Sequence, residues 1–406
     1  MNKKLMAVAV AGALAVPAVA FAQASSVQIY GRANLGVDSW SATGATAPGG
    51  AGDLKNRTRV YDSGSRLGFR GTEDLGGGLR AMFVLESGVN FDTGSTTNQN
   101  GVVGANASAG TLASRDSYLG IGGSWGDVRF GRQSIYWVNG LNGQSGANYI
   151  NNEIGWFNGA GMGRVTFGVA RQPNVMSYNS PTWSGFDFAV KYQPTSEGAT
   201  ANAPTDGNVW GVTLNYEGPI GVRYDHAVNQ FASPTTPTAL TNRQKGTADK
   251  LSIGWPYQPG ARIAVIFNRT RIDDNAATAN YTNVHDNVSQ GYWGLNWEHM
   301  MGNWQFLAMY SKLNNASGCN FTQTAATSAT SGIAVGTNGC DGTQSTGYTL
   351  GLKYFFSKRT QIYTSWIAHN NGFNQVADVT GGGYSSGTVA AGADPRIFAV
   401  GLWHSF

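Results

Sequence analysis

Period-two alternation of apolar and polar residues is the main pattern along this chain. From Val27, one set of alternate residues reads Val, Ile, Gly, Ala, Leu, Val, and the other reads Gln, Tyr, Arg, Asn, Gly, Asp. The same alternation returns from Phe186, Trp210 and Tyr348. Because successive side chains of a strand point to opposite faces, each of these strands places one face in an apolar medium and the other against polar surroundings.

The connections separate a membrane barrel from a soluble β-sandwich, which would show the same period. Tight turns at 124–126, 218–219 and 301–302 alternate with long connections such as 92–114 and 314–345. Short turns on one side and long loops on the other are typical of an outer-membrane barrel. We predict sixteen strands, at 27–38, 59–71, 79–91, 114–123, 127–133, 168–180, 185–193, 207–217, 220–230, 248–256, 261–271, 289–299, 303–313, 345–356, 360–369 and 394–406.

The predicted fold is therefore all-β, a sixteen-stranded antiparallel transmembrane β-barrel that encloses an aqueous lumen. An even strand number closes the barrel and leaves no exposed edge in lipid. Composition agrees, since glycine supplies 57 of the 406 residues and aromatic residues make up 12%. Several aromatic residues lie toward strand ends, as girdle residues do: Tyr192, Tyr216, Trp304, Trp366 and Phe406.

The first 22 residues have the pattern of a cleaved signal peptide. A basic start with Lys3 and Lys4 precedes an apolar run from Leu5 to Val19, and small residues follow at Ala20 and Ala22. We expect the β-barrel to comprise residues 23–406. Removing the leader lowers the 27 basic residues to 25, against 23 acidic ones, a formal charge of +2. With no dense basic run, this balance does not indicate nucleic-acid binding.

Cys319 and Cys340 are the two cysteines of the chain. In an exported protein a pair of cysteines is most simply interpreted as a disulfide. The bond would close a Thr-, Ala-, Ser- and Gly-rich loop of about 20 residues. We expect it to stabilise that loop rather than to carry redox or metal chemistry, and no cofactor is expected.

Several segments resemble the general, non-specific porins of Gram-negative bacteria, particularly the β-proteobacterial branch. They are the opening strand 27–32, the hairpin 65–81, the strand 126–133 and the closing strand 400–406 with its terminal Phe406. These segments follow the family's order along the whole chain. The resemblance implies a homotrimeric outer-membrane porin. The aromatic end of the last strand is what the barrel-assembly machinery would bind by strand addition.

The resemblance also implies that the third long loop, here about 134–167, folds inward and constricts the lumen. This loop carries Glu153 and Arg164, and it lacks the short acidic–Gly motif that the family usually has there. Opposite the loop, the family places a ladder of basic residues on the barrel wall. Carried over by position, that ladder is Arg32, Arg66, Arg115 and Arg171.

Alternation independently places Arg32, Arg66 and Arg171 on the polar faces of their strands. Arg115 fits less well, because strict alternation would put Leu119 and Ile121 inside with it, unless a bulge or a strand start follows Arg115. Four arginines about 8 Å from an ion in water contribute on the order of 2 kcal/mol before salt screening. With Glu153 cancelling one of them, we expect a roughly ten-fold anion preference at low salt.

The opposing interpretation is that these arginines are solvated residues paired with acids such as Asp38, Glu86 or Asp187. Two other functions remain open: a substrate-specific channel for a sugar or organic acid, and an adhesin or receptor that acts through its long loops. The five histidines show no nucleophile motif and no metal-ligand spacing, so we do not expect an enzyme. The expected partners are outer-membrane lipid, lipopolysaccharide and small anionic or neutral solutes.

Overall fold

The computed structural model describes residues 26–46, 52–94, 111–136, 171–194, 208–231, 244–274, 286–318, 340–377, 379 and 389–406. In these ranges the regular elements are seventeen strands. Their bounds are β1 Ser26–Thr43, β2 Leu54–Asp62, β3 Arg66–Gly76, β4 Leu79–Gly88, β5 Ser117–Gly123, β6 Gly126–Ser134, β7 Arg171–Asn179, β8 Phe186–Gln193, β9 Val209–Tyr216, β10 Gly221–Phe231, β11 Gln244–Gln258, β12 Ala261–Asp274, β13 Asp286–Met301, β14 Trp304–Leu313, β15 Ser345–Phe355, β16 Thr360–Asn371 and β17 Asp394–Ser405.

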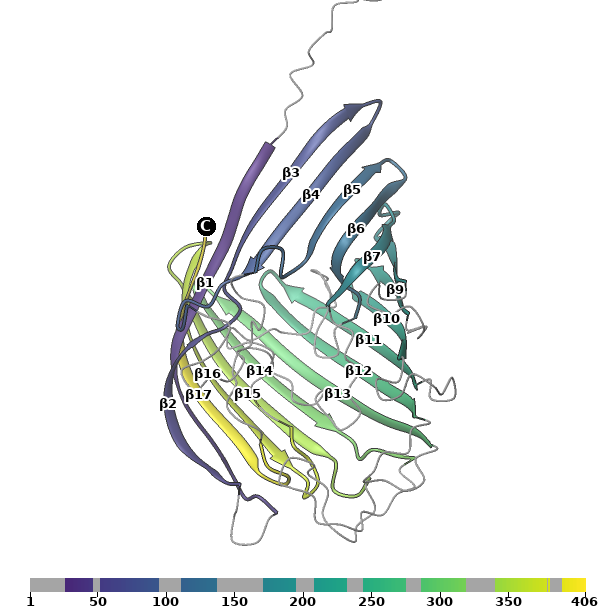
Figure 1. Cartoon of the computed structure of the whole chain (residues 1–406). Helices are drawn as coiled ribbons and strands as arrows, with labels where there is room; N and C mark the ends of the chain where they lie inside the picture. Colours follow the sequence, from purple (N-terminus) through teal and green to yellow (C-terminus); the bar gives the residue numbers. More distant parts are fainter. Residues whose placement is uncertain are drawn as a thin grey trace, which may run out of the picture.

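The strands form one closed antiparallel barrel (Figure 1). From β3 onward each strand pairs with the next, and β17 pairs with β1 to close the sheet. β2 and β3 both pair with β1 and are separated by the short break at 63–65, where the Asp62 carboxylate accepts the Ser65 amide at 3.0 Å. They therefore occupy one position in the barrel, which confirms the predicted sixteen strands. No helix in the described ranges is long and apolar enough to cross a membrane.

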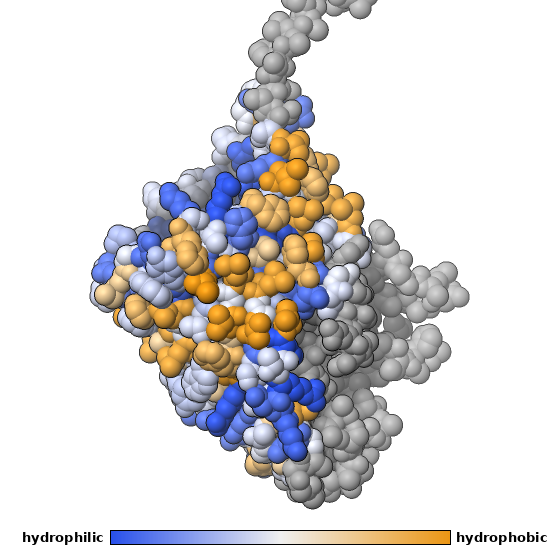
Figure 2. Space-filling view, turned by 90° about the vertical axis from the view of Figure 1, so that its left-hand side faces the viewer, coloured by the Kyte–Doolittle hydropathy of each residue, from blue (hydrophilic) through white to orange (hydrophobic). Residues whose placement is uncertain are grey.

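The alternation along the strands separates the two faces of the barrel as predicted. On β1, Val27 is 66% exposed on the outside, whereas Asn34 is fully buried on the inside. Many outward residues of the other strands are likewise large and apolar, such as Leu350 and Val400. Figure 2 shows hydrophobic side chains gathered in a band across one side of the outer face, with polar ones between them. The band is the surface expected against lipid.

The connections also separate as predicted. Those that join β3 to β4, β5 to β6 and β13 to β14 are tight turns, and they lie at the upper end of the barrel in Figure 1, which we call the short-turn end. The strand ends that the long connections join, such as the end of β4 and the start of β15, lie at the opposite end, which we call the long-loop end. Ser26 starts β1 and Phe406 follows β17 toward the short-turn end, so both ends of the described chain lie on that side.

Part of the inner face is apolar, although alternation alone predicts a polar lumen. Inward residues of β1, β14, β16 and β17 form a buried cluster that includes Trp40, Leu307 and Ile397. Val389 and Ala393, from the connection between β16 and β17, pack against it. The described residues before β17 therefore lie against the inner wall at the long-loop end, and the described interior is not lined by polar groups alone.

Candidate functional site

The basic residues predicted from the sequence lie on the inner face of one sector of the wall. Arg32 on β1 and Arg66 on β3 are direct cross-strand neighbours. The Arg32 Nε donates to the Gly64 carbonyl at 2.9 Å, and its guanidinium lies 4.1 Å from the centre of the Trp403 ring. Stacking on an indole holds an arginine in place without neutralising its charge. Arg32 therefore presents a fixed positive charge to the lumen.

Glu86 on β4 binds two of the predicted arginines. Its Oε1 lies 3.3 Å from Arg66 Nη1 and 2.5 Å from Arg115 Nε, and its Oε2 accepts the Tyr30 hydroxyl at 3.1 Å. The carboxylate is largely buried, so these contacts occur where water screens charge weakly. Glu86 therefore fixes both guanidinium groups on the wall and cancels one of their two charges.

Arg115 reaches this group because β5 starts after it. The strand begins at Ser117, and Leu119 and Ile121 then point outward, 65% and 42% exposed. The Arg115 amide donates to the Glu86 carbonyl at 2.9 Å, which anchors the backbone just before the strand. A strand start after Arg115 is one of the two explanations that the sequence left open.

Arg171, the first residue of β7, pairs with Asp116. The Arg171 Nε lies 3.3 Å from Asp116 Oδ1, and Ser134 donates to the same carboxylate through its amide and its hydroxyl. Burial opposes the charge on Asp116, but the Arg171 guanidinium and these hydrogen bonds outweigh it and hold the pKa of the carboxyl below its usual value of 3.8. A shift in the β6–β7 register, next to Asn174 at a φ of 55°, marks a bulge in β7.

The formal charges of the four predicted arginines and these two carboxylates add up to +2. From the sequence, only Glu153 of the loop is expected to oppose the arginines. Glu86 appeared there under the opposing interpretation, and Asp116 was missed. Its position directly after Arg115 could have indicated it. The other two acids named there have different partners: Asp38 pairs with Arg59 at 3.1 Å, and Asp187 accepts from Asn215 at 3.0 Å.

A second basic group lies on the inner face of β8, β10 and β11. It comprises Lys191, Arg223 and Lys250, with Asp225 as the acid between them. Arg223 donates to Asp225 at 3.0 Å, and Lys250 Nζ lies 3.6 Å from the same carboxylate. Lys250 is only 1% exposed and Arg223 is also buried, so neither side chain meets a solute in the described structure directly.

The residues that follow β6 run along this second group. The Ser134 carbonyl accepts from Lys191 Nζ at 2.6 Å, and the Tyr136 ring lies 4.6 Å from Lys250 Nζ. The Tyr136 hydroxyl accepts from Asn268 on β12 at 2.6 Å. Because β12 is far from β6 around the barrel, residues 134–136 must lie inside the wall. The start of the predicted constriction loop is thus held against the inner face.

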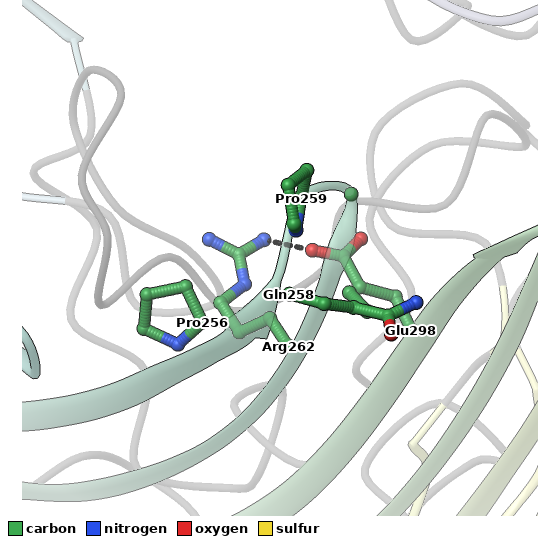
Figure 3. Close-up of a pocket in the computed structure, with 7 residues that line it drawn as sticks. Pro256, Gln258, Pro259, Arg262 and Glu298 are labelled. Atoms are coloured by element: carbon green, nitrogen blue, oxygen red, sulfur yellow. Dashed lines mark ion pairs between the residues drawn. The ribbon is translucent and has the colours of Figure 1, made fainter.

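A pocket lies at the short-turn end, where the β11–β12 turn meets β13 (Figure 3). Arg262 and Glu298 face each other in it, with 2.5 Å between Nη2 and Oε1. Gln305 also donates to Glu298, at 3.2 Å. Because the two charges cancel, this pocket does not add to the positive field of the wall. The remaining lining residues are Pro256, Gln258, Pro259, Gly260 and Ala261.

The other predicted residues are less completely described. Glu153 and Cys319 lie outside the described residues, and so do the leader and most of the constriction loop, so these stay predictions. Cys340 is buried shortly before β15. Phe406 exchanges two backbone hydrogen bonds with Gly31, each 3.1 Å long, which extends the closure of the barrel beyond β17. No group of three or more potential metal ligands occurs in the described ranges.

Comparison with known proteins agrees with this geometry. The sequence model of the Gram-negative porins matches residues 7–374. An outer membrane porin protein of Bordetella pertussis is 33% identical over 297 residues, which cover 66% of this chain and 70% of that protein.

Two solved structures share the fold. The anion-selective porin from Comamonas acidovorans has a TM-score of 0.66 at 21% identity, over 94% of this chain and all of that one. The trimer form of OmpT of Vibrio cholerae has a TM-score of 0.59 at 13% identity, with the same coverage. The paired strands, the lipid-facing band and the sequence match agree, and this chain belongs to the Gram-negative porin family of outer-membrane β-barrels.

Proposed function

We propose that this porin conducts small hydrophilic solutes by passive diffusion and that its pore favours anions. The observation that carries the anion preference is the inner wall with Arg32, Arg66, Arg115 and Arg171, which keeps a net charge of about +2 after Glu86 and Asp116 are counted. The structurally similar Comamonas porin is described as anion-selective, which supports the proposal.

The pairing with acids lowers the expected selectivity. One unit charge about 8 Å from an ion in water contributes on the order of 0.5 kcal/mol. A net charge of two then gives about 1 kcal/mol, or roughly a five-fold preference for anions at low salt. The Debye length falls from about 10 Å at 0.1 M salt to about 3 Å at 1 M, so the preference should largely disappear at molar salt.

We further propose that the loop starting at Ser134 constricts the pore. The contacts of Lys191 with Ser134, and of Lys250 and Asn268 with Tyr136, support an inward path for its first residues. Glu153 would then be the acid on that loop that reduces the positive field. The expected exclusion of larger solutes follows from the constriction, and no catalytic activity is proposed for the barrel.

Reversal potentials across a planar lipid bilayer test the pore function. A potassium chloride gradient at low mean concentration should give stepwise openings and a reversal potential on the anion side, which moves toward zero at high salt. Saturation of conductance by one sugar or organic acid would instead support a substrate-specific channel. Absence of conductance would support an adhesin or receptor, and a cation-side potential would refute anion preference.

Assembly and processing are proposed from the same family. We expect a homotrimer, as in the trimer form of OmpT, and recognition of β17 with Phe406 by the barrel-assembly machinery. We also expect removal of residues 1–22 and a disulfide between Cys319 and Cys340. Mass spectrometry of the protein from outer membranes, with and without a reducing agent, would check both modifications.

A further inference from the structure

The outer face of β10–β13 changes from apolar to charged between two neighbouring rows. Cross-strand pairing aligns the outward residues of the four strands into these rows. The row nearer the short-turn end is apolar or aromatic, and the next row toward the long-loop end is polar. The first row is Tyr224, Leu251, Phe267 and Trp293, and the second is His226, Asp249, Arg269 and Gly291.

Three basic side chains lie at this boundary and form what we call the outer basic patch. Arg269 lies in the polar row, and Arg271 lies one step further toward the long-loop end, opposite Ser289. Lys312 on β14 lies beside Trp293. All three side chains are exposed. By the alternation of the strands, they lie on the same outer face as the apolar Phe267 and Leu295.

The acid nearest the patch already has other partners. Asp249 lies opposite Arg269, but its Oδ1 accepts the Tyr224 hydroxyl at 2.5 Å and lies 2.7 Å from His226 Nδ1. These two contacts hold the carboxylate on the β10 side. Among the outward side chains that the structure describes here, three basic groups lie around the Asp249 carboxylate, so this group of side chains has a net positive charge.

The height of the patch matches the headgroup level of a membrane. At the short-turn end the lipid-facing band begins with an aromatic cluster in which Trp297 Nε1 donates to the Tyr257 hydroxyl at 2.8 Å. From Tyr257 to Asp249 along β11 is about 27 Å at about 3.4 Å per residue. At a strand tilt of about 40° this is roughly 20 Å of height, close to the apolar band of about 25 Å in such barrels. The patch therefore lies at the outer edge of the hydrocarbon layer.

Basic side chains at that depth meet lipid phosphates. Long loops lie on the outside of the cell in these barrels, so the patch faces the outer leaflet. Guanidinium groups bind phosphate oxygens in a bidentate manner, and an ammonium adds a point charge. We infer that Arg269, Arg271 and Lys312 bind the phosphate groups of an anionic lipid in the outer leaflet. The patch is separated from the pore by the barrel wall, so this site is independent of the proposed selectivity.

Native mass spectrometry of the full-length porin in a neutral detergent tests the inference. The probe is lipid A, which carries two phosphates, and the variant is R269Q/R271Q/K312Q. We expect the variant to bind lipid A at least ten-fold more weakly than the unchanged protein, with a difference that shrinks as salt rises. Dephosphorylated lipid A should bind both proteins equally weakly. Inorganic phosphate should not displace the lipid, because acyl chains anchor it beside the barrel.

The matched control removes the same charge from the inner face. R57Q/R70Q/R80Q replaces three exposed arginines on inward positions and should leave lipid A binding unchanged. Equal binding of lipid A by the patch variant and the unchanged protein would overturn the inference. Loss of trimers without loss of lipid binding would also overturn it and would assign the patch to a neighbouring copy. If the triple variant does not fold, R271Q and K312Q alone should each weaken binding two- to three-fold.

Discussion

The pore-facing arginines and the outer basic patch contain similar residues but differ in what surrounds them. Arg66, Arg115 and Arg171 each have a carboxylate within 3.3 Å on the inner wall. On the outside of the barrel, Arg269 lies between Asp249 and Gly291, and Lys312 lies opposite Trp293. Neighbouring positions along one strand face water or lipid in turn. Whether a basic residue acts on solutes or on lipid therefore depends on whether it occupies an inward or an outward position of its strand.

Reversal of two pore charges should have the largest effect. R66E/R171E changes the charge of the inner wall by four units, from about +2 to about −2. At about 0.5 kcal/mol per charge, the permeability ratio should change roughly 30-fold, from an anion to a cation preference at low salt. Reversal potentials in a salt gradient measure this ratio. An unchanged potential in this variant would refute the role of the basic wall.

Removal of the shared carboxylate should have a smaller effect of opposite sign. E86Q frees Arg66 and Arg115 of their common negative partner and adds one net positive charge to the wall. We expect anion preference to rise about two-fold at low salt. E217Q, at an exposed position just after β9, removes the same charge at the short-turn end and should leave the ratio nearly unchanged. A fall in anion preference for E86Q would show that Glu86 acts mainly by positioning the arginines.

Asp116 should have a still smaller effect, because its side chain is 38% exposed, compared with 11% for Glu86, and water screens its charge more strongly. D116N should raise anion preference less than two-fold at neutral pH. Arg171 and Ser134 keep the folded pKa of Asp116 below 3.8, so the carboxylate stays charged throughout the range from pH 5 to 8. Its contribution should therefore not vary in that range, and protonation should add anion preference only below about pH 3.8. A pH titration of the reversal potential in both proteins checks this.

The outer basic patch should have no effect on the pore. R269Q/R271Q/K312Q removes three positive charges, and we expect an unchanged permeability ratio because these groups lie behind the wall in the headgroup layer. Conversely, the R66E/R171E variant should bind lipid A with the same affinity as the unchanged protein. A shift of the reversal potential in the patch variant would mean that the two sets of charges are not independent.

Local patterns predicted the fold well. The strand positions, the tight turns and the face of each strand follow from period two, which each strand carries within its own sequence. Arg115 shows the limit of the rule, because alternation could not tell a bulge from a strand start. The apolar inner cluster shows another limit: Val389 and Ala393 lie in a connection, where no periodicity indicates which surface they contact.

The sequence alone determined that this protein is an outer-membrane barrel and which side chains face its lumen, because those properties depend on spacing along single strands. The tertiary structure decided how much charge the pore keeps. Glu86 meets Arg66 and Arg115 from positions 20 and 29 residues away, through register and a chain reversal between strands. Alternation gives the face of a side chain but not its neighbours on that face. The four arginines were therefore predictable, and the carboxylates that reduce their net charge to about +2 required the fold.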